Sequence, residues 1–463
     1  MVSGMSMKSR SSLCFLFIAS LLAVLAVSCS TVSAGSRTSV SGMMNEVSQD
    51  PSLELGEKLD ILGYDRVEMT FPEVYNDGSQ WKDRLVKMLE DTQDYFICTV
   101  FLGSECDLNQ NVFDTMKAKA QAGVDVYVVI DSSSSLDMTE SRYHMRTLYD
   151  LRDYGVHLLE YNRLSANRIP WVLNLFYREH RKFFVSDGVH VAVGGMNLNY
   201  ISMSSIEDGG DRDAMYVFDS PSCARKLTDD FVEFWNRYSW EEISSLGLDS
   251  GVLETDAVAD NAVEADAVAD NSVEDGSNEG ALISGWIANQ TNGGEIAPMY
   301  GAVMAQAKEE ILMLPFLPTL DSDMYAAVEA CTSNGVKFEM ILRNDDRASL
   351  LNASKYATKD LLDAGVEVWM EDPSAYTNGS LLHEKLVIID ERYVICGSSN
   401  FNYRSLHISS EITLVIDSPE LAMQLKEHYL EIQDYSNQVS YEQASKWHTL
   451  LRKLYFIINY FGG

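Results

Sequence analysis

One spaced pattern of residues occurs twice in this chain, and the duplication limits the possible folds more than any other feature of the sequence. In each copy a histidine is followed by a lysine after two positions, an aspartate after seven, a glycine after fourteen and an asparagine after seventeen. The two sets are His180, Lys182, Asp187, Gly194 and Asn197, and His383, Lys385, Asp390, Gly397 and Asn400. Identical intervals predict that the chain is built from two related halves.

Each copy combines residue types that bind an anion. Residues i and i+2 of an extended strand face the same side, so each histidine and its lysine project together from a strand end. The aspartate marks the turn before the next strand. The repeat glycines let the backbone approach closely, while the asparagine amides donate hydrogen bonds. Gly195 and Ser398, which follow these glycines, are expected to support the site. Two such halves around a pseudo-twofold axis predict one phosphate site.

The same series of elements surrounds both copies. A helix containing Trp81 and Leu85 precedes an apolar strand at residues 95–102, and residues 299–308 precede a strand at 311–316. Further helices that end at a glycine lead into more strands in both halves. The series predicts an α/β fold, with a mixed sheet flanked by helices in each half and one active site at the interface.

Composition divides the chain into segments. Residues 249–280 contain ten acidic residues, no Lys or Arg and a ten-residue repeat, which indicates a flexible linker. It separates a predicted first half at 65–240 from a second at 281–435. An amphipathic tail follows at 440–463.

Two carboxylates occupy matching places in the halves. Asp213 and Glu411 are each followed after six residues by an aspartate and then by Ser-Pro. Each can orient one imidazole, fix its tautomer and raise its basicity.

The beginning of the chain has the features of an export signal. Lys8 and Arg10 precede an apolar run that ends at Cys29, so we expect a signal peptide at 1–28. An apolar run that ends in a small residue, Ser28, directly before Cys29 also resembles a bacterial lipoprotein signal. In such a signal the cysteine carries the lipid anchor. We therefore expect an exported, membrane-anchored lipoprotein on the extracytoplasmic side, with plain cleavage or an uncleaved anchor as alternatives.

Charge and cysteine usage exclude some classes of protein. Loss of residues 1–28 removes Lys8, Arg10 and no acid, so the formal net charge changes from -34 to -36. This charge makes a nucleic-acid partner unlikely. The cysteines beyond Cys29 form no metal-type pair and are predicted mostly as core residues, with only Cys98 and Cys106 near enough in sequence to bridge. No metal or other cofactor is indicated.

The two motifs, H-x-K-x4-D-x6-G-[GS]-x-N, resemble those of the phospholipase D superfamily, and the resemblance covers about residues 70–435. It implies a covalent phosphohistidine mechanism without metal. One histidine attacks phosphorus while the other protonates the leaving alcohol and then activates water or a second alcohol. By this analogy His180 is the nucleophile and His383 the acid and base, and the lysines and asparagines stabilise the phosphate oxygens. The motif aspartates Asp187 and Asp390 are counted among the catalytic residues.

Within the superfamily the chain looks most like the bacterial cardiolipin synthases. It departs from them at Asn402, where they usually have Asp, and at Ser409, where they usually have Asn. We therefore expect a phosphatidyltransferase or phospholipase D that uses a phosphatidylglycerol-like phospholipid at a membrane surface, with no obligate protein partner. A secreted nuclease and a non-catalytic surface lipoprotein of the same fold are the alternatives.

Two segments mix basic and apolar residues. Residues 163–182 are either a loop folded on the core or a wall that accepts acyl chains and an anionic headgroup beside His180. The tail at 447–461 is either a membrane-surface segment or a helix that closes the fold.

Overall fold

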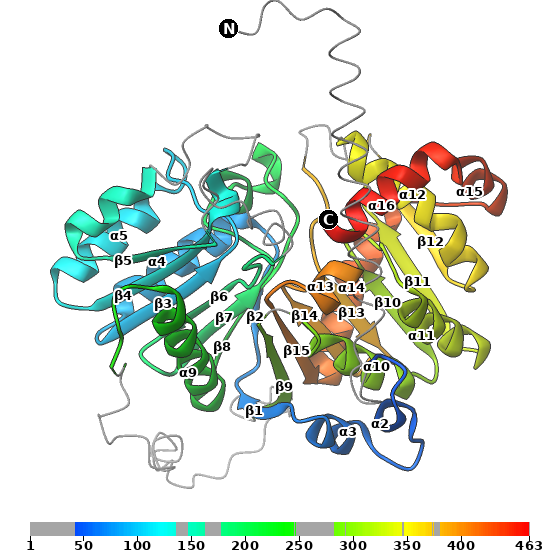
Figure 1. The fold of residues 1–463 in the computed structure, drawn as a ribbon, viewed down its shortest axis with the longest axis horizontal. Coiled ribbons are helices and arrows are strands. Elements are labelled where there is room, and N and C mark those ends of the chain that lie inside the picture. Colours follow the sequence, from blue (N-terminus) through cyan, green and yellow to red (C-terminus); the bar gives the residue numbers. More distant parts are fainter. Residues whose placement is uncertain are drawn as a thin grey trace, which may run out of the picture.

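The chain folds into two α/β units that lie side by side (Figure 1). The computed structural model describes residues 42–135, 147–162, 177–244, 246, 282–291, 293–344, 347–372, 374 and 380–462. The expected signal peptide and Cys29, the linker at 249–280 and most of the basic segment at 163–182 lie outside these residues.

The first unit is a seven-stranded mixed sheet. Its strands are, in spatial order, β2 (Glu73–Tyr75), β8 (Met215–Asp219), β7 (His190–Gly194), β6 (Phe183–Ser186), β3 (Tyr95–Val100), β4 (Asp125–Asp131) and β5 (His157–Tyr161). β3, β4 and β5 are parallel, whereas β6, β7 and β8 pair antiparallel. Its helices are α4 (Gly78–Asp91), α5 (Gln110–Gln121), α8 (Tyr200–Met203) and α9 (Pro221–Tyr238).

The second unit is a nine-stranded mixed sheet. Its strands are β1 (Asp65–Met69), β9 (Ile283–Gln290), β15 (Glu411–Asp417), β14 (Tyr393–Gly397), β13 (Leu386–Ile389), β10 (Glu310–Leu314), β11 (Lys337–Leu342), β12 (Glu367–Glu371) and β16 (Ser436–Gln438). Its helices are α10 (Ile296–Gln306), α11 (Ser322–Ser333), α12 (Ala348–Asp363), α13 (Tyr403–His407), α14 (Pro419–Asp434), α15 (Tyr441–Trp447) and α16 (Leu450–Gly462). The predicted α/β fold class is therefore confirmed.

The glycine signals mark helix ends as predicted. Gly123 follows α5 with a φ of 96°, and Gly335 follows α11 with a φ of 88°. Side chains with a Cβ rarely adopt this left-handed conformation, so glycine lets the chain turn directly into the next strand.

The predicted boundaries of the halves differ from the structure at both ends. The sequence places β1 in the first half, but in the structure it pairs antiparallel with β9 in the second sheet. Before it, α2 (Glu46–Gln49) and α3 (Leu55–Ile61) pack against α10. β16 lies beyond residue 435 and adds an edge strand to β12. Hydrophobic pattern alone does not determine which sheet edge a strand joins.

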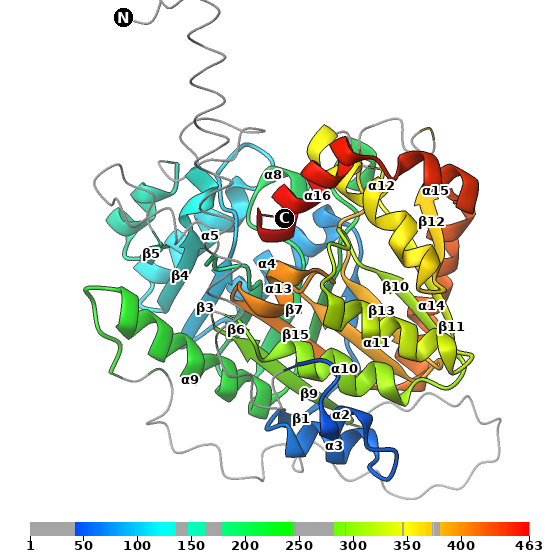
Figure 2. The ribbon, with the colours of Figure 1, turned by 45° about the vertical axis from the view of Figure 1, so that its right-hand side comes forward.

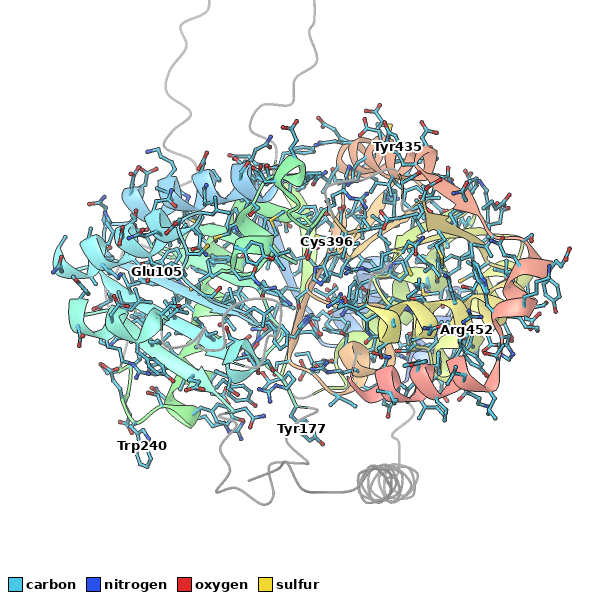
Figure 3. All side chains as sticks on the ribbon, turned by 90° about the horizontal axis from the view of Figure 1, so that it is seen from above. Glu105, Tyr177, Trp240, Cys396, Tyr435 and Arg452 are labelled. Atoms are coloured by element: carbon cyan, nitrogen blue, oxygen red, sulfur yellow. The ribbon has the colours of Figure 1, made fainter. Side chains whose placement is uncertain are left out.

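One apolar core is shared between the two units. Alternate residues of β3 divide between two cores: Ile97 joins the shared core, while Cys98 packs under α4 and α5. The shared core contains residues of α9 from the first unit and α14 from the second. Figure 3, seen from above, shows the units side by side with Cys396, a member of this core, near their junction.

The described cysteines are free, and those predicted as core residues are mostly buried. Cys98, Cys223, Cys331 and Cys396 are buried and Cys106 is half-buried. The sequence-local pair therefore forms no disulfide.

Candidate active site

The two motif histidines face one cavity at the junction of the units. His180 and Lys182 precede β6, and His383 and Lys385 precede β13. The cavity has a volume of about 270 Å³. Its walls are lined by Phe101, Leu102, His180, Asn197, Asn199, Ile201, Ser202, Asp211, Phe316, Arg347, Leu350, His383, Asn400 and Arg404.

Backbone hydrogen bonds cross between the units at both histidines. The His180 N–H donates to the carbonyl oxygen of Ser410 over 3.0 Å, and the His383 N–H donates to that of Arg212 over 2.8 Å. Each motif strand is therefore joined to the segment that leads into a strand of the other sheet. The two connections are equivalent, as the predicted pseudo-twofold axis requires.

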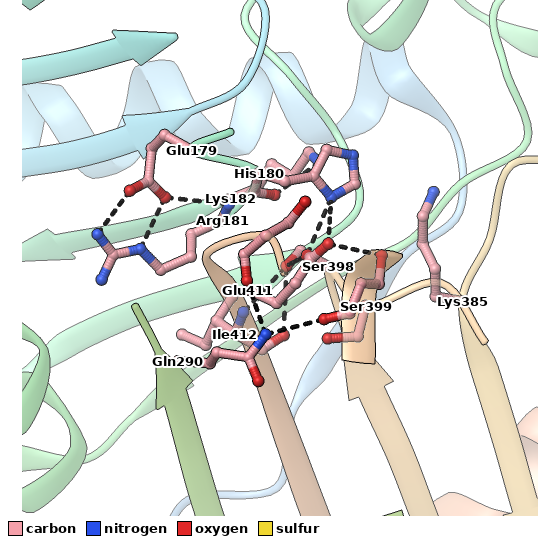
Figure 4. Close-up of polar contacts among 12 residues, drawn as sticks. Glu179, His180, Arg181, Lys182, Gln290, Lys385, Ser398, Ser399, Glu411 and Ile412 are labelled. Carbon is pink, nitrogen blue, oxygen red and sulfur yellow. Dashed lines mark hydrogen bonds and ion pairs between the residues drawn. The ribbon is translucent and has the colours of Figure 1, made fainter. Parts of the chain in front are cut away.

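The carboxylates that hold the imidazoles also come from the opposite unit. The Nδ1 atom of His180 lies 2.9 Å from both carboxylate oxygens of Glu411 (Figure 4). The Nδ1 atom of His383 lies 2.5 Å from Oδ2 of Asp213. A carboxylate at Nδ1 favours the tautomer with its proton there, which leaves Nε2 as the basic atom. Each carboxylate contacts one imidazole as predicted, and the structure adds that the pairing is crossed.

The two carboxylates have different surroundings. Glu411 accepts hydrogen bonds from the Ser398 hydroxyl at 2.5 Å and the Ser405 hydroxyl at 2.7 Å. Asp213 accepts from the Ala214 N–H at 2.9 Å. It packs so closely on Gly195 that a Cβ there would lie 2.1 Å from Oδ1. Gly195 and Ser398 occupy the same motif position. The glycine leaves room for the Asp213 carboxylate, whereas the serine donates a hydrogen bond to the Glu411 carboxylate.

Both lysines lie against their own histidine and an aromatic ring. Lys182 Nζ donates to the His180 carbonyl oxygen at 2.7 Å and lies 5.6 Å from the centre of the Phe101 ring. Lys385 Nζ lies 2.6 Å from His383 Nδ1 and 3.4 Å from Asp213 Oδ2, and it also donates to the His383 carbonyl oxygen. The two buried ammonium groups place positive charge beside the cavity.

Burial controls the protonation of these groups. It lowers the pKa of His180 to about 4 despite the attraction of Glu411, and it lowers the pKa of Lys182 to about 7. Burial and Lys385 together lower the pKa of His383 well below its usual value. Burial raises the pKa of Asp213. Burial also acts to raise the pKa of Glu411, but His180, Lys182 and the Ser398 hydrogen bond together lower it. Both imidazoles are therefore neutral at neutral pH.

The asparagines of both motifs line the cavity. Asn197 Oδ1 accepts a hydrogen bond from the Leu102 N–H at 2.9 Å, which fixes its orientation. Asn400 Oδ1 is buried and makes no hydrogen bond to another described residue. The repeat glycines allow the neighbouring strand to approach closely. A Cβ at Gly194 would lie 2.1 Å from the Ala214 carbonyl oxygen, and one at Gly397 would lie 2.3 Å from that of Ile412.

The motif aspartates do not lie in the cavity, so their assignment as catalytic residues is corrected. The Asp187 carboxylate accepts from the N–H groups of Gln93, Asp94 and Tyr95 at 2.8 to 3.0 Å. Tyr95 begins β3, whereas the cavity residue Phe101 follows its other end. Asp390 makes the equivalent three bonds to residues 308–310. These aspartates hold the helix-to-strand turn.

Sequence reasoning missed several residues of the site. Phe101 and Phe316 lie with their ring centres 5.0 and 4.7 Å from those of His180 and His383. Both follow an apolar strand at matching positions, which is a signal the sequence contained. Asp211, Arg347 and Arg404 also line the cavity. Burial raises the pKa of Asp211 to about 6. No group of three or more potential metal ligands occurs among the described residues.

Comparison with known proteins assigns the family. Residues 85–235 and 301–432 match the family described as "Cardiolipin synthase, PLD-like domain". The chain belongs to this family. It is therefore an enzyme of the phospholipase D superfamily, of the cardiolipin synthase-like phosphatidyltransferase group, as the motifs predicted.

The chain resembles curated relatives over most of its length. It is 23% identical over 375 residues to the cardiolipin synthase of Alkalihalophilus pseudofirmus, covering 80% of this chain and 67% of that protein. It is 23% identical over 388 residues to the minor cardiolipin synthase ClsB of Bacillus subtilis, covering 81% and 86%. The phosphatidylserine synthase structure from Haemophilus influenzae has the same fold, with a TM-score of 0.61, 15% identity and coverage of 86% and 96%.

We expect Asp187→Ala to reduce stability without removing catalysis. Three backbone N–H groups would lose their acceptor, which should cost about 1–3 kcal/mol of unfolding free energy. Thermal unfolding and turnover measured below the transition check this, with Asp390→Ala as the equivalent variant and His180→Ala as the inactive control. Normal stability combined with lost turnover in Asp187→Ala would show that the aspartate acts in catalysis.

We also expect kcat/KM to be highest between pH 4 and pH 7, because this parameter reports ionisations of the free enzyme. Below the His180 pKa of about 4 the nucleophilic imidazole is protonated. Above the Lys182 pKa of about 7 the ammonium group loses the charge that attracts phosphate. A profile on a soluble phosphodiester tests this, and a rate that stays constant up to strongly alkaline pH would contradict the role of Lys182.

Proposed function

We propose that this enzyme transfers a phosphatidyl group from one phosphatidylglycerol-like lipid to the hydroxyl group of a second, through a phosphohistidine on His180. The observation that carries the proposal is the pair of imidazoles on one cavity, each with Nδ1 within hydrogen-bond distance of a carboxylate from the other unit. The cardiolipin synthase relatives support the choice of donor and acceptor.

In the first step, His180 Nε2 attacks phosphorus and the bond to the leaving glycerol oxygen breaks. His383 gives its Nε2 proton to that oxygen. In the second step, His383 takes a proton from the acceptor hydroxyl, whose oxygen attacks phosphorus and breaks the P–N bond. Lys182, Lys385 and the asparagine amides stabilise the charge on the non-bridging oxygens.

The unequal carboxylates support these two roles. Glu411 has a lowered pKa and remains an anion that stabilises the imidazolium formed when His180 becomes phosphorylated. Around His383, burial raises the pKa of Asp213 and lowers that of Lys385, so a proton can move within this trio. A bound phosphodiester anion adds negative charge between the rings and favours protonation of His383.

We further propose that the protein is an exported lipoprotein attached to the membrane through Cys29. The support is the charged and apolar pattern of residues 1–28. In the part of the chain that the structure describes, no helix is long and apolar enough to cross a membrane.

The first test identifies the products from phosphatidylglycerol vesicles by mass spectrometry. The proposal predicts cardiolipin and glycerol from the wild-type enzyme and neither from His180→Ala or His383→Ala. Phosphatidic acid as the main product would mean that water is the acceptor, and no lipid turnover by the wild type would contradict the proposal.

The second test separates the two histidines with a phosphatidyl ester of p-nitrophenol, a leaving group that needs no general acid. We expect His383→Ala to release a burst of p-nitrophenol and to accumulate a covalent adduct on His180. The attack of the acceptor hydroxyl on the phosphohistidine then lacks its general base. His180→Ala should show neither. An adduct on His383 in the His180→Ala variant would reverse the roles.

A further inference from the structure

The last helix of the described chain, α16, closes the second unit beside the active site. Its inner face packs on α12 and α13: Asn459 Nδ2 donates to Ser349 Oγ at 2.9 Å, and the Tyr460 ring stacks on Tyr403 with 4.3 Å between centres. Arg452 Nε donates to Asn352 Oδ1 at 2.9 Å. The expectation that the tail closes the fold is thus met on one face of the helix.

The outer face of α16 is apolar and exposed. Leu450 is 78% exposed, Leu454 46% and Ile458 52%, and their spacing of four residues puts them in one row along the helix. Leu451, next to this row, is 65% exposed. A soluble helix normally turns charged or polar residues outward. A contiguous exposed apolar row therefore marks a surface that contacts something apolar.

The inner face of α16 packs on residues next to the wall of the catalytic cavity. Tyr403, on which Tyr460 stacks, precedes the cavity residue Arg404, and α12 contributes Leu350 to the cavity wall at the end where Ser349 bonds α16. Figure 2 shows α16 lying along α12 with its C-terminal end towards α13 and the junction of the units. The helix is therefore fixed on the two elements, α12 and α13, that contribute Leu350 and Arg404 to the cavity wall.

The charge of the tail differs from that of the rest of the chain. Residues 441–463 contain Lys446, Arg452 and Lys453 but only one acid, Glu442, in a chain of net charge -34. No acidic residue occurs within α16. An apolar face beside the exposed Lys453, on a helix without acidic residues, matches the surface of a bilayer that contains anionic lipids.

We propose that the outer face of α16 inserts into the surface of an anionic phospholipid bilayer and holds the cavity entrance at the lipid interface. The inner face of α16 packs along α12, so the exposed row runs along the surface of the protein. The choice of a bilayer rests on the proposed function, since a lipid substrate must leave a membrane to enter the cavity. The residues that match the family model end at 432, before α16 begins.

Site-specific photocrosslinking tests the contact without requiring turnover. A benzophenone amino acid replaces Leu454 in the full chain, which is reconstituted into phosphatidylglycerol and phosphatidylethanolamine vesicles and irradiated. The matched control carries the same label in place of Leu430, which is 43% exposed on α14. We expect phospholipid adducts from position 454 in several-fold excess over position 430. Equal yields at both positions, or adducts from 454 only to protein, would overturn the proposal.

Paired substitutions test the consequence for activity. We expect Leu454→Glu with Ile458→Glu to reduce turnover of vesicle phosphatidylglycerol several-fold and to leave turnover of a short-chain, monomeric phosphatidylglycerol unchanged. Met423→Glu with Leu430→Glu, at similarly exposed positions on α14, should change neither. Equal loss on both substrates would contradict a membrane role. If the wild type turned over no lipid, the proposed function would fail while the crosslinking result stood.

Discussion

The crossed contact between each imidazole and the carboxylate of the other unit is the interaction on which the site depends. Neither unit holds a complete histidine and carboxylate pair of its own, since Glu411 reaches His180 and Asp213 reaches His383. The backbone bonds from the same two histidines cross in the same way. Catalytic geometry and the docking of the two units are consequently set by the same few residues.

Buried ion pairs stabilise the two segments whose backbone hydrogen bonds join the units. Arg178, two residues before His180, donates from Nε to both carboxylate oxygens of Asp131 at 3.1 Å, and Arg212 pairs with Glu371. Breaking a buried pair leaves an uncompensated charge, so these contacts hold the segments in one arrangement. The shared apolar core supplies the nonspecific part of the association, and the polar contacts fix its register.

The sequence predicted the duplication, the α/β fold and the motif histidines and asparagines that line the cavity, because equal spacing and strand periodicity are local properties. It did not predict that each carboxylate pairs with the histidine of the other unit. Positions along the chain alone do not show which of the two histidines Asp213 or Glu411 contacts. The motif also grouped Asp187 with His180, although one holds a turn and the other lines the cavity. A residue needed by both halves for folding repeats as faithfully as one needed for chemistry. The assignment of β1 to the wrong half has a similar cause, because strand pairing is a long-range choice.

The crossed pairing is tested most directly by NMR of the histidine ring nitrogens in enzyme labelled with ¹⁵N-histidine. The account predicts that Glu411→Gln changes the nitrogen shifts and titration of His180 and leaves those of His383 nearly unchanged, while Asp213→Asn does the reverse. If Glu411→Gln instead altered His383, each carboxylate would pair within its own unit, and the composite site described above would be wrong.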